Sequence, residues 1–393
     1  MLGVPAADAH PDAASQSIDN PGNDRAALQA VVHDLCTKQV AMLGEAAHGD
    51  GRTDSFKVAL VEQLVTKCGY NAVFFEASHY DFLAIDRRLR RHEEVTADMV
   101  SSAIGGLWKF DLEFKPLVPF LLAEAKSGRL ALGGLDFQLG ALESFYANDA
   151  MPAELTSYLD ESQRAQCREA FRHRTYWNYP ESAPYSAAQH DELLACVSSI
   201  TRAIDARSGA DPQLRAEQLD MLVNIRRSIE PDLSDATVRN GARDRAMFLN
   251  LRWLVNRLPP HRKIIVWTAT AHAARDITPQ MEMVRPFGSY VHETYGPRAF
   301  ALGFTARSGS YRYARKTNKQ LPAPPPGSLE ESAIAKDGDA TAYLGAPRLA
   351  KLGPVPGAAF GHQYHIFGWN SLLDGIVVFP AEHPPHSTRS GYE

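Results

Sequence analysis

The stretch Val40-Ala41-Met42-Leu43-Gly44-Glu45-Ala46-Ala47-His48-Gly49 decides the fold of this chain. Its apolar, uncharged start is typical of a strand that is buried on both faces of a parallel sheet. We expect Gly44 and Gly49 to supply the backbone freedom with which the chain leaves the sheet. Glu45 and His48 would then lie at the carboxyl edge of the sheet, where open α/β sheets bind their ligands.

The residues after this stretch predict a helix and a second buried strand. Phe56, Leu60 and Leu64 recur at helical spacing, and the uncharged run 71–75 ends on Glu76. A Glu three residues before a His also fits a simple helix cap, so the first stretch alone leaves a capping role open. Two consecutive strands that both end on an acid favour a functional site at one sheet edge.

Further strand-like runs alternate with helical segments along the chain, and each is short and apolar. They are residues 129–136, 263–267, 300–304 and 374–379. The first ends on Asp136, and the second leads into a turn that carries His272. The alternation predicts a three-layer α/β fold with a mainly parallel central sheet and helices on both faces.

One region departs from this alternation. Residues 139–235 show helical periodicity and no strand-like run. We interpret them as a helical insertion, or lid, in an α/β core formed by residues 25–138 and 236–393. Residues 1–24 are rich in Ala, Asp, Pro and Ser, so they are expected to be a disordered lead-in. The segment after Pro380 is expected to be loose.

The composition argues against several classes of protein. A net charge of −5 without a dense Lys/Arg block argues against nucleic acid or an acidic membrane as the main partner. No apolar run approaches the ~20 residues of a membrane helix, and no signal-peptide pattern opens the chain, so a cytoplasmic location is expected. The four cysteines lack metal-ligand spacing and are expected to be reduced packing residues.

Distinct motifs occur between about residue 39 and residue 380. They are Gly44-Glu45-Ala46-Ala47-His48-Gly49, Phe74-Phe75-Glu76, Trp108 with Glu113, Gly134-Leu135-Asp136, Arg243-Asp244-Arg245-Ala246-Met247, and Val266-Trp267 with His272. Together they resemble the erythromycin esterase family. The resemblance implies a metal-independent hydrolase that needs no cofactor. Its substrate would be a small molecule with an ester, lactone or related acyl bond, in a bulky natural product such as a macrolide or a polyketide-like compound.

The resemblance also implies catalytic roles. His48 corresponds to the general base, and Glu45, Glu76 and His272 correspond to functional groups around it. The chemistry of these residue types agrees, because an imidazole oriented by a carboxylate can take a proton from water. A second imidazole or a cation can then stabilise the oxyanion. The sequence holds no Gly-x-Ser-x-Gly motif, so a serine nucleophile is not expected.

A further set of residues is predicted to contact the substrate: Lys57, Trp108, Asp136, Arg243 and His292. Lys57 stands where the family carries a basic residue on the first helix. Arg243 shares a helix face with Met247 and is expected to point into the cleft. Trp108 either walls the cleft or fills the core, and the sequence leaves both open. His292 is the strongest candidate among the other histidines.

One departure from the family pattern affects function. After the fourth strand the family reads Trp-Ala-His-Asn-x-His, whereas this chain places Ala269 at the first histidine and keeps His272. An alanine side chain offers no proton and no hydrogen bond. The alternatives to hydrolysis are therefore a divergent biosynthetic enzyme, a non-catalytic small-molecule binding protein, or a metal-dependent hydrolase on the same scaffold. The sequence also leaves open whether the role is in antibiotic resistance or in biosynthesis.

Overall fold

A seven-stranded sheet forms the centre of the computed structural model, which describes residues 21–140, 143–176, 186–207, 211–260, 262–277, 285–313, 317–335 and 338–388. The strand order is β3-β2-β4-β1-β5-β11-β8, and neighbours pair in parallel except β11 with β8. The strands are β1 (Val40–Glu45), β2 (Ala72–Ser78), β3 (Ala131–Asp136), β4 (Ile264–Ala269), β5 (Ala299–Ala306), β8 (Ala342–Gly345) and β11 (Gly375–Phe379). The prediction of a mainly parallel central sheet is confirmed.

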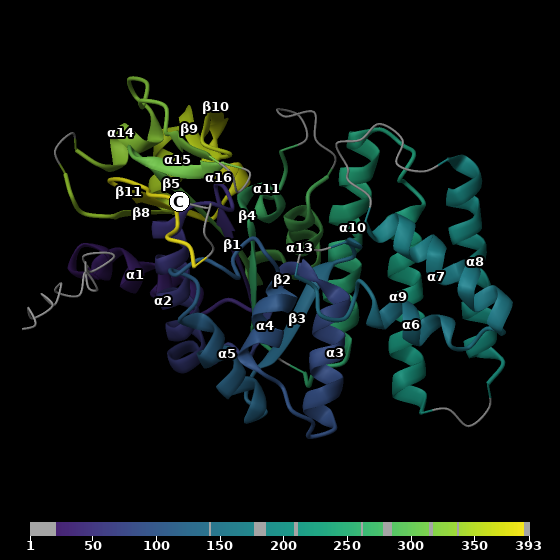
Figure 1. Cartoon of the computed structure of the whole chain (residues 1–393). Helices are drawn as coiled ribbons and strands as arrows, with labels where there is room; N and C mark the ends of the chain where they lie inside the picture. Colours follow the sequence, from purple (N-terminus) through teal and green to yellow (C-terminus); the bar gives the residue numbers. More distant parts are fainter. Residues whose placement is uncertain are drawn as a thin grey trace, which may run out of the picture.

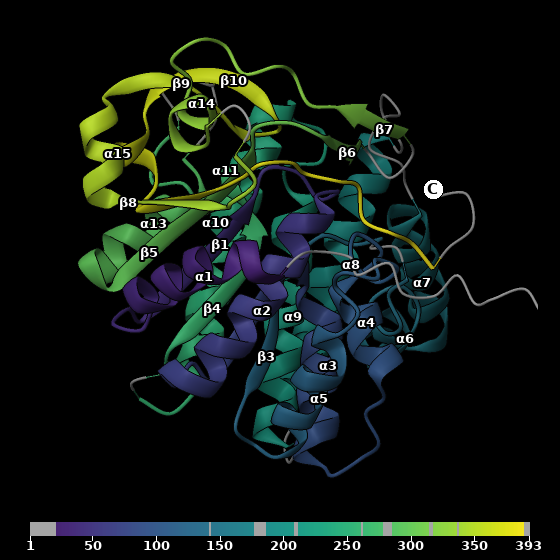
Figure 2. The same ribbon diagram turned by 90° about the vertical axis from the view of Figure 1, so that its left-hand side faces the viewer.

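Each face of the sheet carries its own hydrophobic core, because successive side chains of a strand point to opposite faces. Ala41 and Leu43 of β1 pack in one core, and Val40 and Met42 pack in the other. The helices that supply the first core are α1 (Pro21–Leu35), α2 (Gly51–Cys68), α4 (Ala97–Ile104) and α5 (Leu117–Lys126). The second core includes α10 (Ala236–Asn256) and α13 (Phe287–Tyr295), and α3 (His79–Arg90) contributes to both. The three predicted layers are therefore present (Figures 1 and 2).

The connections that leave β1 and β4 run to opposite faces of the sheet. β1 continues into α2 in the first helical layer, whereas β4 continues into α11 (Thr270–Ala273) and α13 in the second. The chain moves outward from β1 to β3 and returns through β4 to β5, and right-handed crossovers then place the helices on opposite faces. Adjacent strands with diverging connections form the crevice in which α/β sheets bind ligands.

Helices fill the described part of the predicted insertion. They are α6 (Ala150–Thr156), α7 (Glu161–Thr175), α8 (Ala187–Asp205) and α9 (Pro212–Ile229), which lie beside α10 in Figure 1. Phe171, Ile200 and Ile225 belong to the same core cluster as Met247 of α10. The insertion is thus packed onto the second helical layer. Its boundaries at residues 139 and 235 and its action as a lid stay predictions.

The two ends of the chain differ in how far the structure describes them. Residues 1–20 of the predicted lead-in lie outside the described residues, and α1 already begins at Pro21. The segment after Pro380 is bound to the core, so the expectation of a loose tail is wrong as far as Thr388. Short bridges join Glu382 to Gly309 and Ser387 to Asp111. Such backbone pairing leaves no hydrophobic pattern in the sequence.

Besides β8, the region between β5 and β11 holds several short elements. They are β6 (Ser310–Tyr313), β7 (Thr317–Gln320), α14 (Leu329–Ala333), α15 (Ala346–Leu352), β9 (Pro354–Phe360), β10 (Gln363–Gly368) and α16 (Trp369–Leu372). β6 pairs with β7 and β9 with β10, each as an antiparallel two-stranded sheet. In Figure 1 β9 and β10 lie above β5, β8 and β11 of the central sheet.

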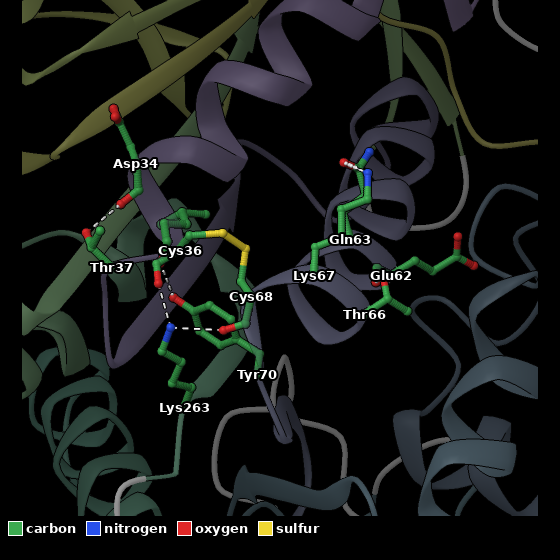
Figure 3. Close-up of a disulfide and its surroundings, with 11 residues drawn as sticks. Asp34, Cys36, Thr37, Glu62, Gln63, Thr66, Lys67, Cys68, Tyr70 and Lys263 are labelled. Carbon is green, nitrogen blue, oxygen red and sulfur yellow. Dashed lines mark hydrogen bonds between the residues drawn. A yellow bond between two sulfur atoms is a disulfide. The ribbon is translucent and has the colours of Figure 1, made fainter.

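The four cysteines form two disulfides, so the expectation of reduced cysteines is wrong. Cys36 follows α1 and bonds to Cys68 at the end of α2 (Figure 3). Cys167 of α7 bonds to Cys196 of α8. Sequence spacing missed both pairs because each joins two helices that become neighbours only in the fold. Disulfides are rare in reducing compartments. The cytoplasmic location stays a prediction, and these pairs count against it. No helix in the described part of the chain has the length and apolar character that crossing a membrane requires.

Candidate active site

The turn after β1 holds His48 against Glu45. Glu45 is the last residue of β1, and its Oε1 lies 2.7 Å from His48 Nδ1. Asp50 shapes the turn, because its carboxylate accepts the backbone N–H of Ala47 at 2.9 Å. The hydrogen bond between Nδ1–H and Glu45 leaves Nε2 as the basic nitrogen of the His48 ring.

Gly44 and Gly49 serve close packing rather than a special backbone conformation. Neither has a positive φ angle. A Cβ on Gly44 would lie 2.6 Å from the Cα of Thr270, and one on Gly49 would lie 2.0 Å from the carbonyl oxygen of Arg312. The predicted glycine role is therefore corrected: both glycines let neighbouring backbone approach the turn that carries His48.

Glu76 anchors the centre of the site. It lies where the pairing of β2 with β3 shifts register, an irregularity that re-aims side chains. Its Oε1 accepts Arg243 Nη2 at 2.7 Å and lies 3.2 Å from His272 Nε2, and its Oε2 accepts Thr268 Oγ1 at 2.8 Å and the N–H of Ala269 at 3.0 Å. Burial raises the pKa of Glu76, but the charges of His272 and Arg243 outweigh it and hold the pKa well below its usual range. Glu76 is therefore ionised.

His272 is a cation at neutral pH. Its Nδ1 lies 2.8 Å from Asp244 Oδ1, and its Nε2 bonds to Glu76. Burial lowers the pKa of His272, but the two carboxylates dominate and raise it to about 10. Arg243 Nη1 lies 3.0 Å from His272 Nε2. Both side chains are donors when His272 is protonated, so these two nitrogens do not form a hydrogen bond with each other. Each side chain instead donates to Glu76 Oε1.

His48 faces Glu76 across a short gap. Its Nε2 lies 3.9 Å from Glu76 Oε1, which is too long for a direct hydrogen bond, and its side chain is 31% exposed. Trp108 packs edge-on against the His48 ring at 5.2 Å between centroids. Burial lowers the pKa of His48, but the hydrogen bond to Glu45 and the charge of Glu76 raise it above its ordinary value of 6.5. The structure thus brings Glu45, His48, Glu76 and His272 together.

Two of the residues predicted to contact substrate are instead bonded within the protein. Lys57 is fully buried, bonds to Glu45 Oε2 through Nζ, and lies 3.9 Å from the centroid of the Trp267 ring. Asp136 Oδ2 accepts Arg243 Nε at 3.1 Å and Nη2 at 2.7 Å. We therefore assign Lys57 to holding Glu45 and Asp136 to holding Arg243.

The remaining candidates divide between the site and its surroundings. Arg243 is 20% exposed and lies beside Glu76. Trp108 is buried and meets the site through its contact with His48. His292 lies on α13 with Nε2 3.6 Å from Asp374 Oδ2, immediately before β11. Because the site is at the opposite, carboxyl ends of β1, β2 and β4, the assignment of His292 to substrate is not supported by this placement.

Sequence reasoning missed two residues that hold the site. Asp244 orients His272 and also accepts the backbone N–H of Phe287 at 2.7 Å. Thr268 binds Glu76 from the neighbouring strand β4. Asp244 stood next to Arg243 in a motif that was already singled out, so its acidic side chain was a usable signal. Thr268 has no such signal, because its role depends on β4 lying beside β2.

Comparison with known proteins agrees with this architecture. The sequence model named Erythromycin esterase matches residues 65–357. The chain belongs to the erythromycin esterase family. Among curated proteins, “Putative hydrolase YbfO” of Bacillus subtilis (strain 168) is 23% identical over 357 residues, which span 82% of this chain and 78% of that protein. These two matches support a hydrolase of this family.

Solved structures share the fold of this family member. A protein from Bacillus cereus superposes with a TM-score of 0.72 at 15% identity over 94% of this chain and 95% of its own. A succinoglycan biosynthesis protein gives 0.70 at 15% identity over 91% and 92%. A mutant of erythromycin esterase EreC in its open conformation gives 0.66 at 16% identity over 94% and 97%. At such low identities the likeness shows the fold alone.

Proposed function

We propose that this protein hydrolyses an ester, lactone or related acyl bond in a bulky natural product, with water activated by His48. The observation that carries the proposal is the environment of His48. Its Nδ1 is held by Glu45 at 2.7 Å, its side chain is 31% exposed, and its basic Nε2 faces the ionised Glu76. A positioned imidazole with one nitrogen anchored and the other open is the arrangement of a general base.

The neighbouring groups restrict which residue can take the proton. Glu76 is ionised but already accepts four donors, and its pKa lies well below the usual range, so it is a weak base. His272 is protonated and cannot accept a proton near neutral pH. Glu45 is bonded to Lys57 and His48. His48 Nε2 is the base that remains.

The proposed reaction has two steps. His48 Nε2 takes a proton from water as the water oxygen bonds to the acyl carbon and the carbonyl electrons move onto oxygen. The oxyanion then collapses, the bond to the leaving oxygen breaks, and that oxygen receives the proton from His48. Arg243 is suited to stabilise the oxyanion, because Nη1 does not contact Asp136 or Glu76 in the bonds described above. His272 adds positive charge nearby.

A panel of aryl esters, lactones and macrolides tests the proposal in water enriched in ¹⁸O. We expect one ¹⁸O atom in the carboxylic acid product, since the attacking oxygen comes from water. Absence of turnover on every acyl substrate, with tight binding of a natural product, would favour a non-catalytic binding protein. Ala269 is the observation that keeps this second function in consideration, because the family imidazole is missing at that position.

A further inference from the structure

We propose that Glu113, His383 and His386 form a zinc site outside the candidate active site. Each of the three residues offers a ligand atom, and these atoms lie within 4.8 Å of one another. Two imidazoles and one carboxylate are a donor set that proteins use for Zn²⁺. The three residues take no part in the contacts around His48 described above, so the inference goes beyond the proposed function.

The backbone around His383 is fixed before any metal binds. Glu382 Oε1 accepts the N–H of Arg52 at 2.7 Å, and Oε2 accepts Thr53 Oγ1 at 2.7 Å, which ties the segment to the start of α2. The carbonyl of His383 accepts the N–H of Gly51 at 2.8 Å. Since these bonds hold the chain in place, binding a cation would cost little backbone entropy.

The two prolines between the histidines stiffen the chelating loop. The segment reads His383-Pro384-Pro385-His386, and each proline ring restricts φ to a narrow range. His383 Nδ1 donates to the carbonyl oxygen of Pro384 at 2.9 Å. That bond fixes the tautomer in which Nε2 carries the lone pair, as a carbonyl or carboxylate partner does for metal-ligating histidines. A carbonyl partner on one ring nitrogen is therefore consistent with a ligand role for the other.

Glu113 supplies a buried carboxylate at the open end of this loop. Its side chain is buried, and its oxygens accept the N–H of His386 at 3.1 and 3.0 Å and lie 2.5 Å from His386 Nδ1. The His386 side chain is 58% exposed, so a cation can approach from solvent. In a tetrahedral site with Zn–N bonds of 2.0–2.1 Å the ligand atoms stand about 3.4 Å apart. The bond between His386 Nδ1 and Glu113 Oε1 is shorter than this spacing, so the exposed His386 side chain would rotate away from Glu113 to admit the ion.

A zinc ion here would act as a clamp between two segments. His383 and His386 belong to the carboxyl-terminal segment, and Glu113 belongs to the loop that also carries Trp108. Trp108 packs against His48. The metal would thus restrain one wall of the candidate active site without touching the reacting groups. Three protein ligands leave a fourth position for water.

Zinc binding to the tag-free, chelator-treated full chain tests the site. We expect one Zn²⁺ per chain by competition with a chromophoric chelator, and a higher melting temperature in its presence. His386→Ala and Glu113→Gln should each weaken binding by about 100-fold or more, because losing a ligand should cost at least as much as the 10–100-fold typical for losing a ligand's hydrogen-bond partner. His33→Ala, which removes an exposed histidine on α1, should bind zinc as the wild type does.

The outcomes separate a built site from incidental binding. His386 is largely exposed, and Gln at position 113 keeps an oxygen acceptor, so both variants are expected to show wild-type circular dichroism and metal-free melting temperature. No stoichiometric zinc in the wild type would overturn the proposal. Equal zinc affinity in wild type and His386→Ala would overturn it as well, as would a preference for Mg²⁺ over Zn²⁺. Loss of binding in both ligand variants but not in His33→Ala would support it.

Discussion

His48 Nε2 and Glu76 Oε1 lie 3.9 Å apart, facing each other without a direct hydrogen bond. Each is held from behind by other groups: His48 by Glu45, and Glu76 by Arg243, His272 and β4. The pair therefore combines an anchored base with a carboxylate that stays charged when the base is protonated.

Replacing His48 by Asn should reduce turnover of an accepted acyl substrate by about 10²-fold or more, the usual contribution of a general base. Folding should change little, because the side chain is partly exposed and Asn can still donate towards Glu45. Steady-state kinetics on the purified variant measure the effect, with His33→Asn as a matched control. Wild-type kcat in His48→Asn would remove His48 from the base role.

The acidic limb of the pH profile of kcat/KM should have its midpoint at a higher pH than an ordinary histidine would give. His48 acts as a base only when neutral, and its pKa is raised above 6.5, so kcat/KM should fall as the pH drops through a midpoint above 6.5. The plateau should extend towards pH 10, where His272 loses its proton and its positive charge. In Glu45→Gln the hydrogen bond to a charged partner is lost, so the acidic midpoint should move down. An acidic midpoint at or below 6.5 in the wild type contradicts this assignment.

Lys57→Met should destabilise the protein strongly. Lys57 and Glu45 are buried partners, and removing one member of such a pair leaves an uncompensated charge at a cost of about 3–5 kcal/mol. The free energy of unfolding in urea measures the loss. Adding Glu45→Gln to Lys57→Met removes the stranded charge and should restore part of the stability. A cost below about 1 kcal/mol for Lys57→Met would show that the pair does not carry this energy.

Erythromycin-type macrolides should be opened slowly or not at all. Position 269 lacks the imidazole of the family, and loss of one oxyanion donor costs about 3–4 kcal/mol, a rate factor near 10²–10³. Ala269→His should recover some ring opening, followed by mass spectrometry. Restoring the family Asn as well, by Thr270→Asn, is expected to disturb the turn. Buried Thr270 donates to the carbonyls of Gly44 and Glu45 at 2.6 and 3.0 Å. Efficient opening by the wild type would show that Ala269 is no handicap.

Removing the disulfide between Cys36 and Cys68 should lower the free energy of unfolding. The bond closes a loop with a sequence separation of 32, and crosslinks of this kind contribute about 2–4 kcal/mol. The double variant Cys36→Ser with Cys68→Ser, compared with the wild type in urea without reductant, measures this. Cys167→Ser with Cys196→Ser serves as the matched pair on α7 and α8. If reductant leaves the stability of the wild type unchanged, the disulfides do not form in solution.

The sequence predicted the parallel core well because its signals are local. The apolar run before Glu45 and the one before Glu76 are each complete within one strand, and parallel pairing brings their acids to one edge. The antiparallel pair β9 and β10 lacked such a signal: several of its residues are half-exposed, the apolar Ile366 is exposed, and no alternation of polar and apolar side chains marks the pair. A sheet edge that carries acidic residues was therefore predictable, whereas the antiparallel strand pairs beside the central sheet were not.

The roles of individual site residues were harder to predict than their presence. Lys57 reads as an available cation on a helix, but burial beneath Glu45 turns it into an internal counter-charge. His292 has the right residue type at the wrong end of the sheet. Which group faces substrate depends on side-chain direction and on contacts across long stretches of chain, and no local pattern encodes either.

The bond between Glu382 and the N–H of Arg52 spans 330 residues of chain. During synthesis at about 5–20 residues per second, Glu382 emerges on the order of tens of seconds after Arg52. Throughout that interval the N–H of Arg52 lacks the Glu382 carboxylate that accepts it in the folded protein. The turn around His48 and the start of α2 therefore cannot complete their native contacts until Glu382 is synthesised. We expect this region to be the last to acquire its native structure during synthesis.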